Sequence, residues 1–449
     1  MKFTSLLGHT LELFDLTVRE KSPADQVVDK FFRARRYLGS KDRRFISESV
    51  YGMLRHKLRI EEVFRQAIGV ERGIGTGHHN GSSVGLYATY LLTVEEKAPQ
   101  YLFENLRSYW NIHFPRVRLE QITEKILLHR ELDFAPSDPA TRLSLKHSFP
   151  KWMVEEWLEQ FGEPETEDLC DALNKPAPLT IRVNTLKTTV EECQRRLMQE
   201  GIESTPTQLS LFGLHLGKRV NFQTLGSFKD GWFEVQDEGS QILPLLTDPD
   251  IRRDETIVDA CAGGGGKTLE LAALMENQGR ILAFDVDKRR LGNLEHRAQR
   301  AGARNVEVRL LDKGSRQEGR DDIGKVDAVF IDAPCSGLGT LRRNPGNKWK
   351  VSQRFVDEVA AQQRRLLEEW SRVLQPGGRL VYATCTIMRK ENENVVEEFL
   401  NSHRHFTLVS ASEVLARRGL ADHFKDRYLR LYPHRHGTDG FFAAVMVLA

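Results

Sequence analysis

The sequence predicts an α/β protein whose C-terminal half is a doubly wound parallel sheet, preceded by a small α+β module and an all-helical region. After about residue 226, short β-branched or apolar runs alternate with helical segments, as in parallel strands joined by crossover helices. Before about residue 130, apolar residues recur at three- and four-residue steps. Between them, helical and β-rich stretches are mixed. The expected domains are therefore 1–140, 141–225 and 226–449.

Composition is that of a globular protein in water. The chain has 449 residues, of which 40% are hydrophobic and 29% charged, and no apolar run approaches the length of a membrane helix. The segment Met1–Lys21 carries Glu12, Asp15, Arg19 and Glu20 where a secretory signal would need an apolar block. Five cysteines without paired spacing predict neither a metal site nor a disulfide framework. We expect a cytoplasmic monomer with no membrane partner.

The helical region carries a strongly basic stretch. Although the net charge of the chain is only +2, the segment from Lys30 to Arg59 has ten basic residues against Asp42 and Glu48. Such a patch can bind nucleic-acid phosphates. The alternative, that these charges only form a solvent-exposed helix face, has equal weight. The basic residues are Lys30, Arg33, Arg35, Arg36, Lys41, Arg43, Arg44, Arg55, Lys57 and Arg59.

Loop and linker signals divide the first half of the chain. A Gly/His/Ser-rich stretch from Arg72 to Gly85 interrupts the helices, and the Pro- and Asp-containing stretch from Glu131 to Ala140 reads as a linker. From Pro150 a helix is followed by a β-rich string at 179–184 and another helix at about 190–198. This order predicts the small α+β module.

Five strands are expected in the C-terminal half, and a ligand site at their carboxyl ends. The predicted strands are Thr256–Ala260, Arg280–Asp285, Val306–Leu310, Asp327–Asp332 and Arg379–Thr384.

A glycine-rich turn follows the first of these strands. It reads Cys261-Ala262-Gly263-Gly264-Gly265-Gly266-Lys267, and the next strand ends in Asp285. Glycines allow a tight turn and close backbone approach to a ligand, while an acidic residue at the second strand end can bind ribose hydroxyls. The register fits neither a Gly-x-Gly-x-x-Gly dinucleotide loop nor a P-loop. Lys267 could neutralise the carboxylate of a methionine moiety.

Two cysteines follow two strands that should be adjacent. Cys335 lies in Asp332-Ala-Pro-Cys-Ser-Gly337, and Cys385 follows Tyr382-Ala-Thr384. A single cysteine is usually a small buried hydrophobe, which is the interpretation we keep for Cys170 and Cys193. Two cysteines at neighbouring strand ends, at the edge of the sheet where a nucleotide binds, indicate a catalytic role for their thiols.

These motifs resemble the Sun/RsmB family of RNA (cytosine-5) methyltransferases. The resemblance covers about residues 140–449. More weakly, the segments Asp42–Phe45 and Val50–Arg55 resemble the NusB-like RNA-binding domain of the RsmB branch. The motifs are Asp332–Gly337, Thr384-Cys385, Arg182–Asn184, Gln236–Ser240 and Asp439–Phe442. The resemblance implies a Rossmann-like class I methyltransferase domain.

The cofactor loop departs from the family pattern at one position. The family usually has Cys-Ala-Ala-Pro-Gly-Gly-Lys, whereas Gly264 stands here in place of the proline. A more flexible loop should raise the ordering entropy of cofactor binding without removing a liganding side chain.

The resemblance also implies residue roles. Cys385 would attack carbon 6 of cytosine, Cys335 would assist release of the product, and Asp332 would lie near both cofactor and base. The loop would bind S-adenosyl-L-methionine, with Asp285 on the ribose side of the cofactor and Asp312 on the adenine side. The loop residues assigned to the cofactor are Cys261, Ala262, Gly263, Gly264, Gly265, Gly266 and Lys267.

The expected substrate is RNA with an unstacked cytosine. The candidates for RNA contacts are Arg182, Arg343, Arg43 and Arg44. The alternative interpretation, that they are ordinary surface arginines, has equal weight. The NusB-like region favours small-subunit ribosomal RNA over transfer RNA. A non-catalytic RNA-binding assembly factor should have lost Cys385 or the acidic strand ends, and a nucleotide-dependent oxidoreductase would not explain the paired cysteines.

Overall fold

The computed structural model describes residues 3–69, 82–131, 138–311, 323–421 and 423–449. The chain forms two compact units: unit 1 comprises 1–176 with Leu341–Val351, and unit 2 comprises 177–340 with 352–449.

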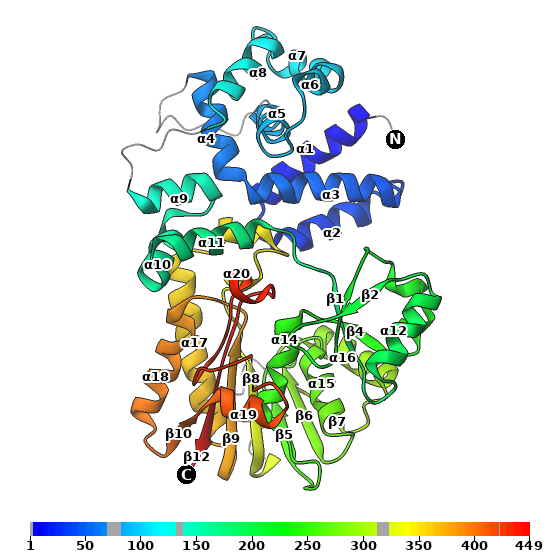
Figure 1. The fold of residues 1–449 in the computed structure, drawn as a ribbon, viewed down its shortest axis with the longest axis vertical. Coiled ribbons are helices and arrows are strands. Elements are labelled where there is room, and N and C mark those ends of the chain that lie inside the picture. The colour runs from blue at the N-terminus through cyan, green and yellow to red at the C-terminus, as the bar shows by residue number, and fades with distance from the viewer. Residues whose placement is uncertain (1–2, 70–81, 132–137, 312–322, 422) are drawn as a thin grey trace. The chain divides into compact units, whose positions relative to one another are not determined.

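Unit 1 is helical throughout its described residues (Figure 1), as predicted. In α3, buried Ile46, Val50, Met53 and Leu54 recur at three- and four-residue steps, so one face enters the core of the unit. The helices are α1 (Phe3–Arg19), α2 (Ala24–Ala34), α3 (Ser40–Arg55), α4 (Lys57–Ile68), α5 (Ser82–Thr93), α6 (Pro99–Asn105), α7 (Arg107–His113), α8 (Leu119–Leu128), α9 (Pro139–His147), α10 (Lys151–Phe161) and α11 (Glu163–Asn174).

A segment from the C-terminal half of the sequence completes unit 1. Leu341–Val351, with the 3₁₀ turn η5 (Pro345–Trp349), packs among these helices. Lys348 is 1% exposed, and its Nζ donates to the Arg55 carbonyl at 2.7 Å and to Asn174 Oδ1 at 3.1 Å. The sequence pattern alone placed this segment within 226–449, and its hydrogen bonds place it in unit 1.

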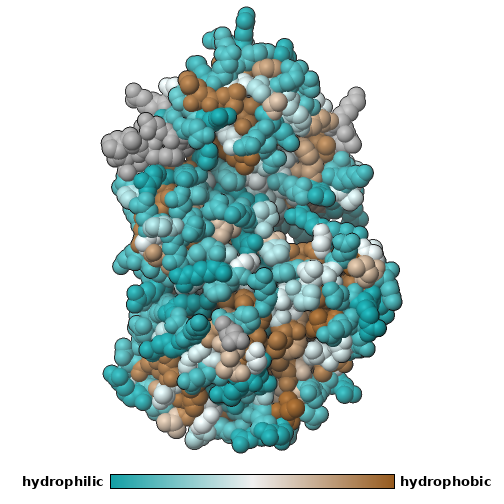
Figure 2. Space-filling view, viewed as in Figure 1, coloured by the Kyte–Doolittle hydropathy of each residue, from teal (hydrophilic) through white to brown (hydrophobic). Residues whose placement is uncertain are grey.

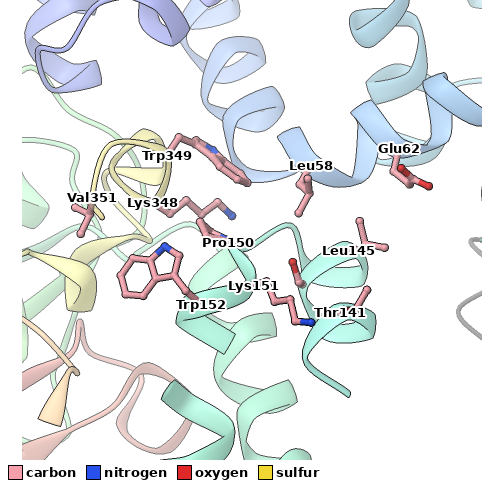
Figure 3. Close-up of a pocket in the computed structure, with 11 residues that line it drawn as sticks. Leu58, Glu62, Thr141, Leu145, Pro150, Lys151, Trp152, Lys348, Trp349 and Val351 are labelled. Carbon is pink, nitrogen blue, oxygen red and sulfur yellow. The ribbon is translucent and has the colours of Figure 1, made fainter. Parts of the chain in front are cut away.

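This segment also lines a pocket of unit 1. The pocket has a volume of about 570 Å³, and Trp349 and Trp152 contribute aromatic rings to its wall (Figure 3). The Trp349 indole N–H donates to the Leu54 carbonyl at 2.7 Å, which fixes the ring against α3.

Unit 2 begins with the antiparallel sheet of the small α+β module, whereas α10 and α11, which the sequence predicts within that module, belong to unit 1. The antiparallel sheet has the strand order β2-β3-β1-β4, and the core beside it contains Ile181, Val183, Leu197 and Phe233. The elements are β1 (Thr180–Val183), α12 (Val190–Gln199), β2 (Ser204–Pro206), β3 (Gly213–Leu216), η1 (Phe222–Thr224), α13 (Gly226–Lys229) and β4 (Phe233–Val235).

The larger sheet of unit 2 has the order β10-β12-β9-β8-β5-β6-β7, with β11 paired to β12. The five strands from β9 to β7 are mutually parallel, whereas β10, β11 and β12 pair antiparallel. This confirms the predicted parallel sheet. The strands are β5 (Thr256–Asp259), β6 (Arg280–Asp285), β7 (Val306–Leu310), β8 (Val326–Asp332), β9 (Leu374–Thr384), β10 (Phe406–Val409), β11 (Leu429–Leu431) and β12 (Phe441–Leu448).

Helices cover both faces of this sheet (Figure 1). Alternate side chains of β8 point to opposite faces: Val329 and Ile331 lie in the cluster that contains Trp370 of α17, and Phe330 lies in the cluster that contains Leu271 of α15. The covering elements are α14 (Glu238–Ile242), η2 (Pro244–Thr247), α15 (Gly266–Leu274), α16 (Lys288–Ala301), α17 (Gln353–Ser371), α18 (Glu393–Ser402) and α19 (Ala411–Arg417). Short turns at η4 (Leu338–Thr340), η6 (Arg389–Glu391) and α20 (Pro433–His436) complete the unit.

Hydrophilic residues dominate the surface visible in Figure 2, and apolar side chains gather there only in small groups. Among the described residues, none of the helices combines the length and apolar character needed to cross a bilayer.

Candidate active site

The glycine-rich turn lies between β5 and α15, at the carboxyl end of the central strands. Gly263 and Gly265 have positive φ angles of 55° and 85°. A Cβ on Gly265 would lie 2.1 Å from Leu294 Cδ1, so glycine is required there, whereas a Cβ on Gly263 would meet nothing closer than 4.0 Å. The turn therefore packs tightly against α16 at Gly265 and leaves open space at Gly263.

Asp285, at the end of β6, holds this turn in place. Its Oδ2 accepts a hydrogen bond from the Gly263 N–H at 2.8 Å, and its Oδ1 accepts from the Asp287 N–H at 2.8 Å. Each carboxylate oxygen keeps a second lone pair for a ligand hydroxyl. Asp285, for which the sequence predicts ribose binding, thus lies beside the open space at Gly263.

Lys267 in the first turn of α15 forms an ion pair with Asp332 at the end of β8. The Lys267 Nζ lies 2.6 Å from Asp332 Oδ2. Burial lowers the pKa of Lys267, but the neighbouring Asp332, Cys385 and Asp259 together outweigh burial, so the pKa is raised overall. Lys267 therefore carries a positive charge at neutral pH, and this charge lies within electrostatic reach of Cys385.

A buried polar layer supports the turn from within the protein. Asp259 at the end of β5 accepts from Thr268 Oγ1 at 2.7 Å, and burial raises the pKa of Asp259 to about 7. Arg182, predicted to contact RNA, is 2% exposed and donates to Gln236 Oε1 at 2.7 Å and to the Gly266 carbonyl at 3.3 Å. In this position Arg182 supports the start of α15, and we do not include it among the proposed RNA contacts.

The two cysteines meet at the same edge of the sheet. Because β8 and β9 are adjacent and parallel, Cys335 and Cys385 come together, with their sulfur atoms 3.2 Å apart. The Cys385 N–H donates to Cys335 Sγ at 3.4 Å, and the Gly339 N–H donates to the Cys385 carbonyl at 3.0 Å. The hydrogen bond to Cys385, followed by burial, raises the pKa of Cys335 well above its ordinary value.

Two residues that the sequence did not indicate lie behind the cysteines. Glu391 and Asn392, at 0% and 4% exposure, contact the residues next to both cysteines. They occur in the charged stretch 389–394, which reads as a solvated surface. Only their burial and their contacts identify them.

The remaining predicted residues are placed as follows. Cys170 and Cys193 are fully buried, as expected. Asp312 lies outside the described residues. Arg343 is half-buried in the Leu341–Val351 segment of unit 1. Arg43 donates to the Leu38 carbonyl at 2.9 Å, while Arg44 is 68% exposed and pairs with Glu48.

Part of the basic stretch is used within unit 1. Arg35 pairs with Glu12 at 2.5 Å, Arg55 donates to the Arg342 carbonyl at 2.9 Å, and Lys57 pairs with Glu61 at 2.7 Å. Lys30, Arg36, Lys41 and Arg44 are exposed. The surface available to phosphates is therefore narrower than the count of basic residues indicates.

The chain is similar to proteins described as ribosomal RNA methyltransferases. A family model described as "16S rRNA methyltransferase RsmB/F" matches residues 247–447, and a ferredoxin-like domain described for the same methyltransferases matches residues 149–223. A protein from Synechocystis sp., described as "Probable ribosomal RNA small subunit methyltransferase B", is 31% identical over 95% of each chain. "Ribosomal RNA small subunit methyltransferase B" from Pectobacterium carotovorum is 29% identical over 92% of each chain.

Solved structures are similar as well. The crystal structure of PH0851 is 30% identical, with a TM-score of 0.75 and 98% of each chain covered. A methyltransferase homologue from Pyrococcus horikoshii is 29% identical, with a TM-score of 0.59, covering 70% of this chain and 100% of its own.

Proposed function

The chain belongs to the RsmB/RsmF family of ribosomal RNA methyltransferases, and we propose that it methylates carbon 5 of a cytosine in small-subunit ribosomal RNA, with Cys385 as nucleophile. The observation that carries this proposal is the pair of sulfur atoms 3.2 Å apart at the ends of β8 and β9. A single-cysteine mechanism would not need the second thiol.

The loop after β5 fits the cofactor S-adenosyl-L-methionine. Open space at Gly263 lies beside the Asp285 carboxylate, which suits the hydroxyls of a ribose, and Lys267 suits the carboxylate of a methionine moiety. S-adenosyl-L-methionine supplies the methyl group. The cofactor residues are Cys261 to Lys267 and Asp285, with Asp332 beside them; the role predicted for Asp312 remains part of this proposal.

Cys385 activates the base. Carbon 5 of cytosine is a weak nucleophile, so the Cys385 thiolate first adds to carbon 6, forming a sulfur–carbon bond and placing electron density on carbon 5. Once carbon 5 carries the methyl group, a proton acceptor removes the proton from carbon 5. The sulfur–carbon bond then breaks, which restores the aromatic ring and returns the thiolate to Cys385.

Cys335 and Asp332 have different tasks. Because the raised pKa of Cys335 keeps it a thiol at neutral pH, it can donate a hydrogen bond to the sulfur of Cys385 as that sulfur leaves carbon 6. This is the release role that we propose for Cys335. Asp332, paired with Lys267 at 2.6 Å, can accept hydrogen bonds from the N4–H of the cytosine and, once the ring is protonated at N3, from the N3–H.

The exposed basic residues of unit 1 are proposed to hold the RNA backbone. Lys30, Arg36, Lys41 and Arg44 are exposed, and Tyr37 among them is 67% exposed. Basic side chains next to an aromatic ring suit unpaired RNA, because phosphates and unstacked bases can both be bound. Arg43 and Arg343 remain candidates for further contacts.

Analysis of the modified nucleoside tests this proposal. The protein is incubated with methyl-labelled S-adenosyl-L-methionine and unmodified small-subunit ribosomal RNA, and the RNA is digested to nucleosides. We expect label in 5-methylcytidine, and none with Cys385→Ala. Label in another nucleoside would contradict methylation at carbon 5 of cytosine. In a parallel incubation with transfer RNA, label in transfer RNA and none in ribosomal RNA would contradict the proposed substrate.

A further inference from the structure

Glu391 accepts hydrogen bonds from the loop that carries Cys335. Its Oε2 accepts from the Ser336 N–H at 2.7 Å, and its Oε1 accepts from Ser336 Oγ at 2.5 Å. Gln363 of α17 donates to the same Oε2 at 3.2 Å and to the Pro334 carbonyl at 2.9 Å. The residues on both sides of Cys335 are therefore held by one buried carboxylate and one amide.

Asn392 holds the other loop. Its Oδ1 accepts from Thr384 Oγ1 at 2.6 Å, and its Nδ2 donates to the Thr386 carbonyl at 3.1 Å. These are the two neighbours of Cys385 in the chain. Asn392 thus binds the residue on each side of the nucleophile, through the Thr384 hydroxyl and the Thr386 carbonyl, from the position next to Glu391.

The two loops are joined through one further contact. Thr386 Oγ1 donates to Glu391 Oε1 at 3.0 Å and lies 2.9 Å from Ser336 Oγ. The Tyr382 hydroxyl donates to the Glu391 carbonyl at 2.6 Å, which fixes the backbone of the pair against β9. The separation of the two sulfur atoms therefore depends on a buried hydrogen-bond network whose centre is the pair Glu391–Asn392.

We propose that Glu391 and Asn392 are positioning residues with separate tasks: Glu391 places Cys335 for release of the product, and Asn392 places Cys385 for attack on the cytosine. This assignment rests on the proposed function. It follows from the division of side-chain contacts, because three of the four groups that the Glu391 carboxylate binds belong to or support the Cys335 loop, whereas both side-chain contacts of Asn392 are to neighbours of Cys385.

The division predicts opposite kinetic signatures. In Glu391→Ala the Ser336 donors lose their acceptor, Cys335 is displaced, and the covalent protein–RNA adduct should accumulate. In Asn392→Ala the nucleophile is displaced, so the adduct should form more slowly and should not accumulate. Loss of a buried hydrogen-bond network should change the affected step by about tenfold or more.

Conservative variants keep the test informative if alanine at position 391 prevents folding. Glu391→Gln retains an acceptor for the Ser336 N–H, and the two hydroxyls can turn to accept from the new amide, so it should accumulate less adduct than Glu391→Ala. Ser336→Ala removes one donor and should shift the same step in the same direction.

The experiment measures adduct and product together in single turnovers with ribosomal RNA. Glu393→Ala is the matched control, because Glu393 is also buried and adjacent but pairs with Arg430 at 2.7 Å instead of with a cysteine loop. Glu393→Ala should lower the melting temperature without changing the ratio of adduct to product. Cofactor affinity should stay unchanged in Glu391→Ala, Asn392→Ala and Glu393→Ala.

Two outcomes separate the proposals. If Cys335→Ala accumulates adduct but Glu391→Ala slows adduct formation as Asn392→Ala does, the division of tasks is overturned and the proposed function stands. If Cys335→Ala itself accumulates no adduct, the release role of Cys335 fails, and with it the premise of this inference.

Discussion

The sulfur atoms of Cys335 and Cys385 lie 3.2 Å apart, although fifty residues separate them in the chain. The sheet produces this contact, because each cysteine follows one of two adjacent parallel strands. The two thiols are not equivalent. The pKa of Cys335 is raised by its hydrogen bond to Cys385 and by burial, so Cys335 keeps its proton at neutral pH and can donate a hydrogen bond to the sulfur of Cys385.

Removing the Asp332 carboxylate should make activity sensitive to alkaline pH. In the native protein this carboxylate offsets the effect of burial and raises the pKa of Lys267, so Lys267 keeps its positive charge as the pH rises. In Asp332→Asn burial is no longer offset, the pKa of Lys267 falls, and the charge is lost at lower pH. We expect the single-turnover rate to fall by about 100-fold.

The reduction of the single-turnover rate in Asp332→Asn should become larger as the pH rises. The measurement is the ratio of variant to native rate between about pH 6 and pH 10, at saturating cofactor and RNA. The ratio should decline as the pH rises. A ratio that stays constant would show that the charge of Lys267 does not depend on Asp332.

Gly264→Pro should strengthen cofactor binding. The sequence departs from the family pattern at this position, and Gly264, unlike Gly263 and Gly265, does not have a positive φ angle. Proline reduces the conformational freedom of the unliganded loop and should lower the dissociation constant of S-adenosyl-L-methionine by about two- to fivefold. Titration calorimetry measures it, with Gly265→Pro as a control that should abolish binding, because Gly265 has a φ of 85°. Weaker binding of Gly264→Pro would contradict the entropic argument.

The stability of unit 2 should decrease between pH 6 and pH 8 through Asp259. Burial raises the pKa of this carboxyl from its ordinary value near 3.8 to about 7 in the folded protein. The folded state therefore holds the proton more tightly than the unfolded state. This contribution to stability is complete below the unfolded pKa and is lost as the pH rises through about 7.

The expected size of the Asp259 effect is about 1 kcal/mol between pH 6 and pH 8. Asp259→Asn should remove this dependence, so native and variant melting temperatures should converge or cross as the pH rises. Asp230→Asn is a control, because Asp230 is exposed. Parallel melting curves for native protein and Asp259→Asn would show that Asp259 does not retain its proton in the folded state.

The sequence was sufficient to predict the sheet and the meeting of the two cysteines, because strands and turns leave local signals and adjacent strand ends share an edge. Other features depend on tertiary contacts. Arg182 lies in a strand between Ile181 and Val183, and only the packing of α15 shows that its own face is also covered. The Leu341–Val351 segment has no composition that distinguishes it from its neighbours, and hydrogen bonds from Lys348 and Trp349 assign it to unit 1.

Glu391 and Asn392 show the same limit at the site itself. They stand in a run of charged and polar side chains, a pattern typical of a solvent-exposed turn. Their burial follows from donors supplied by three other segments, at Ser336, Gln363 and Thr384–Thr386. No local periodicity encodes that convergence.

The most direct test of the two-cysteine account is a denaturing gel of the Cys335→Ala protein after incubation with S-adenosyl-L-methionine and unmodified small-subunit ribosomal RNA. The account predicts a covalent protein–RNA band that appears with Cys335→Ala and disappears when Cys385 is also replaced by alanine. A band that persists in the double variant, or that appears with Cys385→Ala instead, would contradict the assignment of Cys385 as the nucleophile.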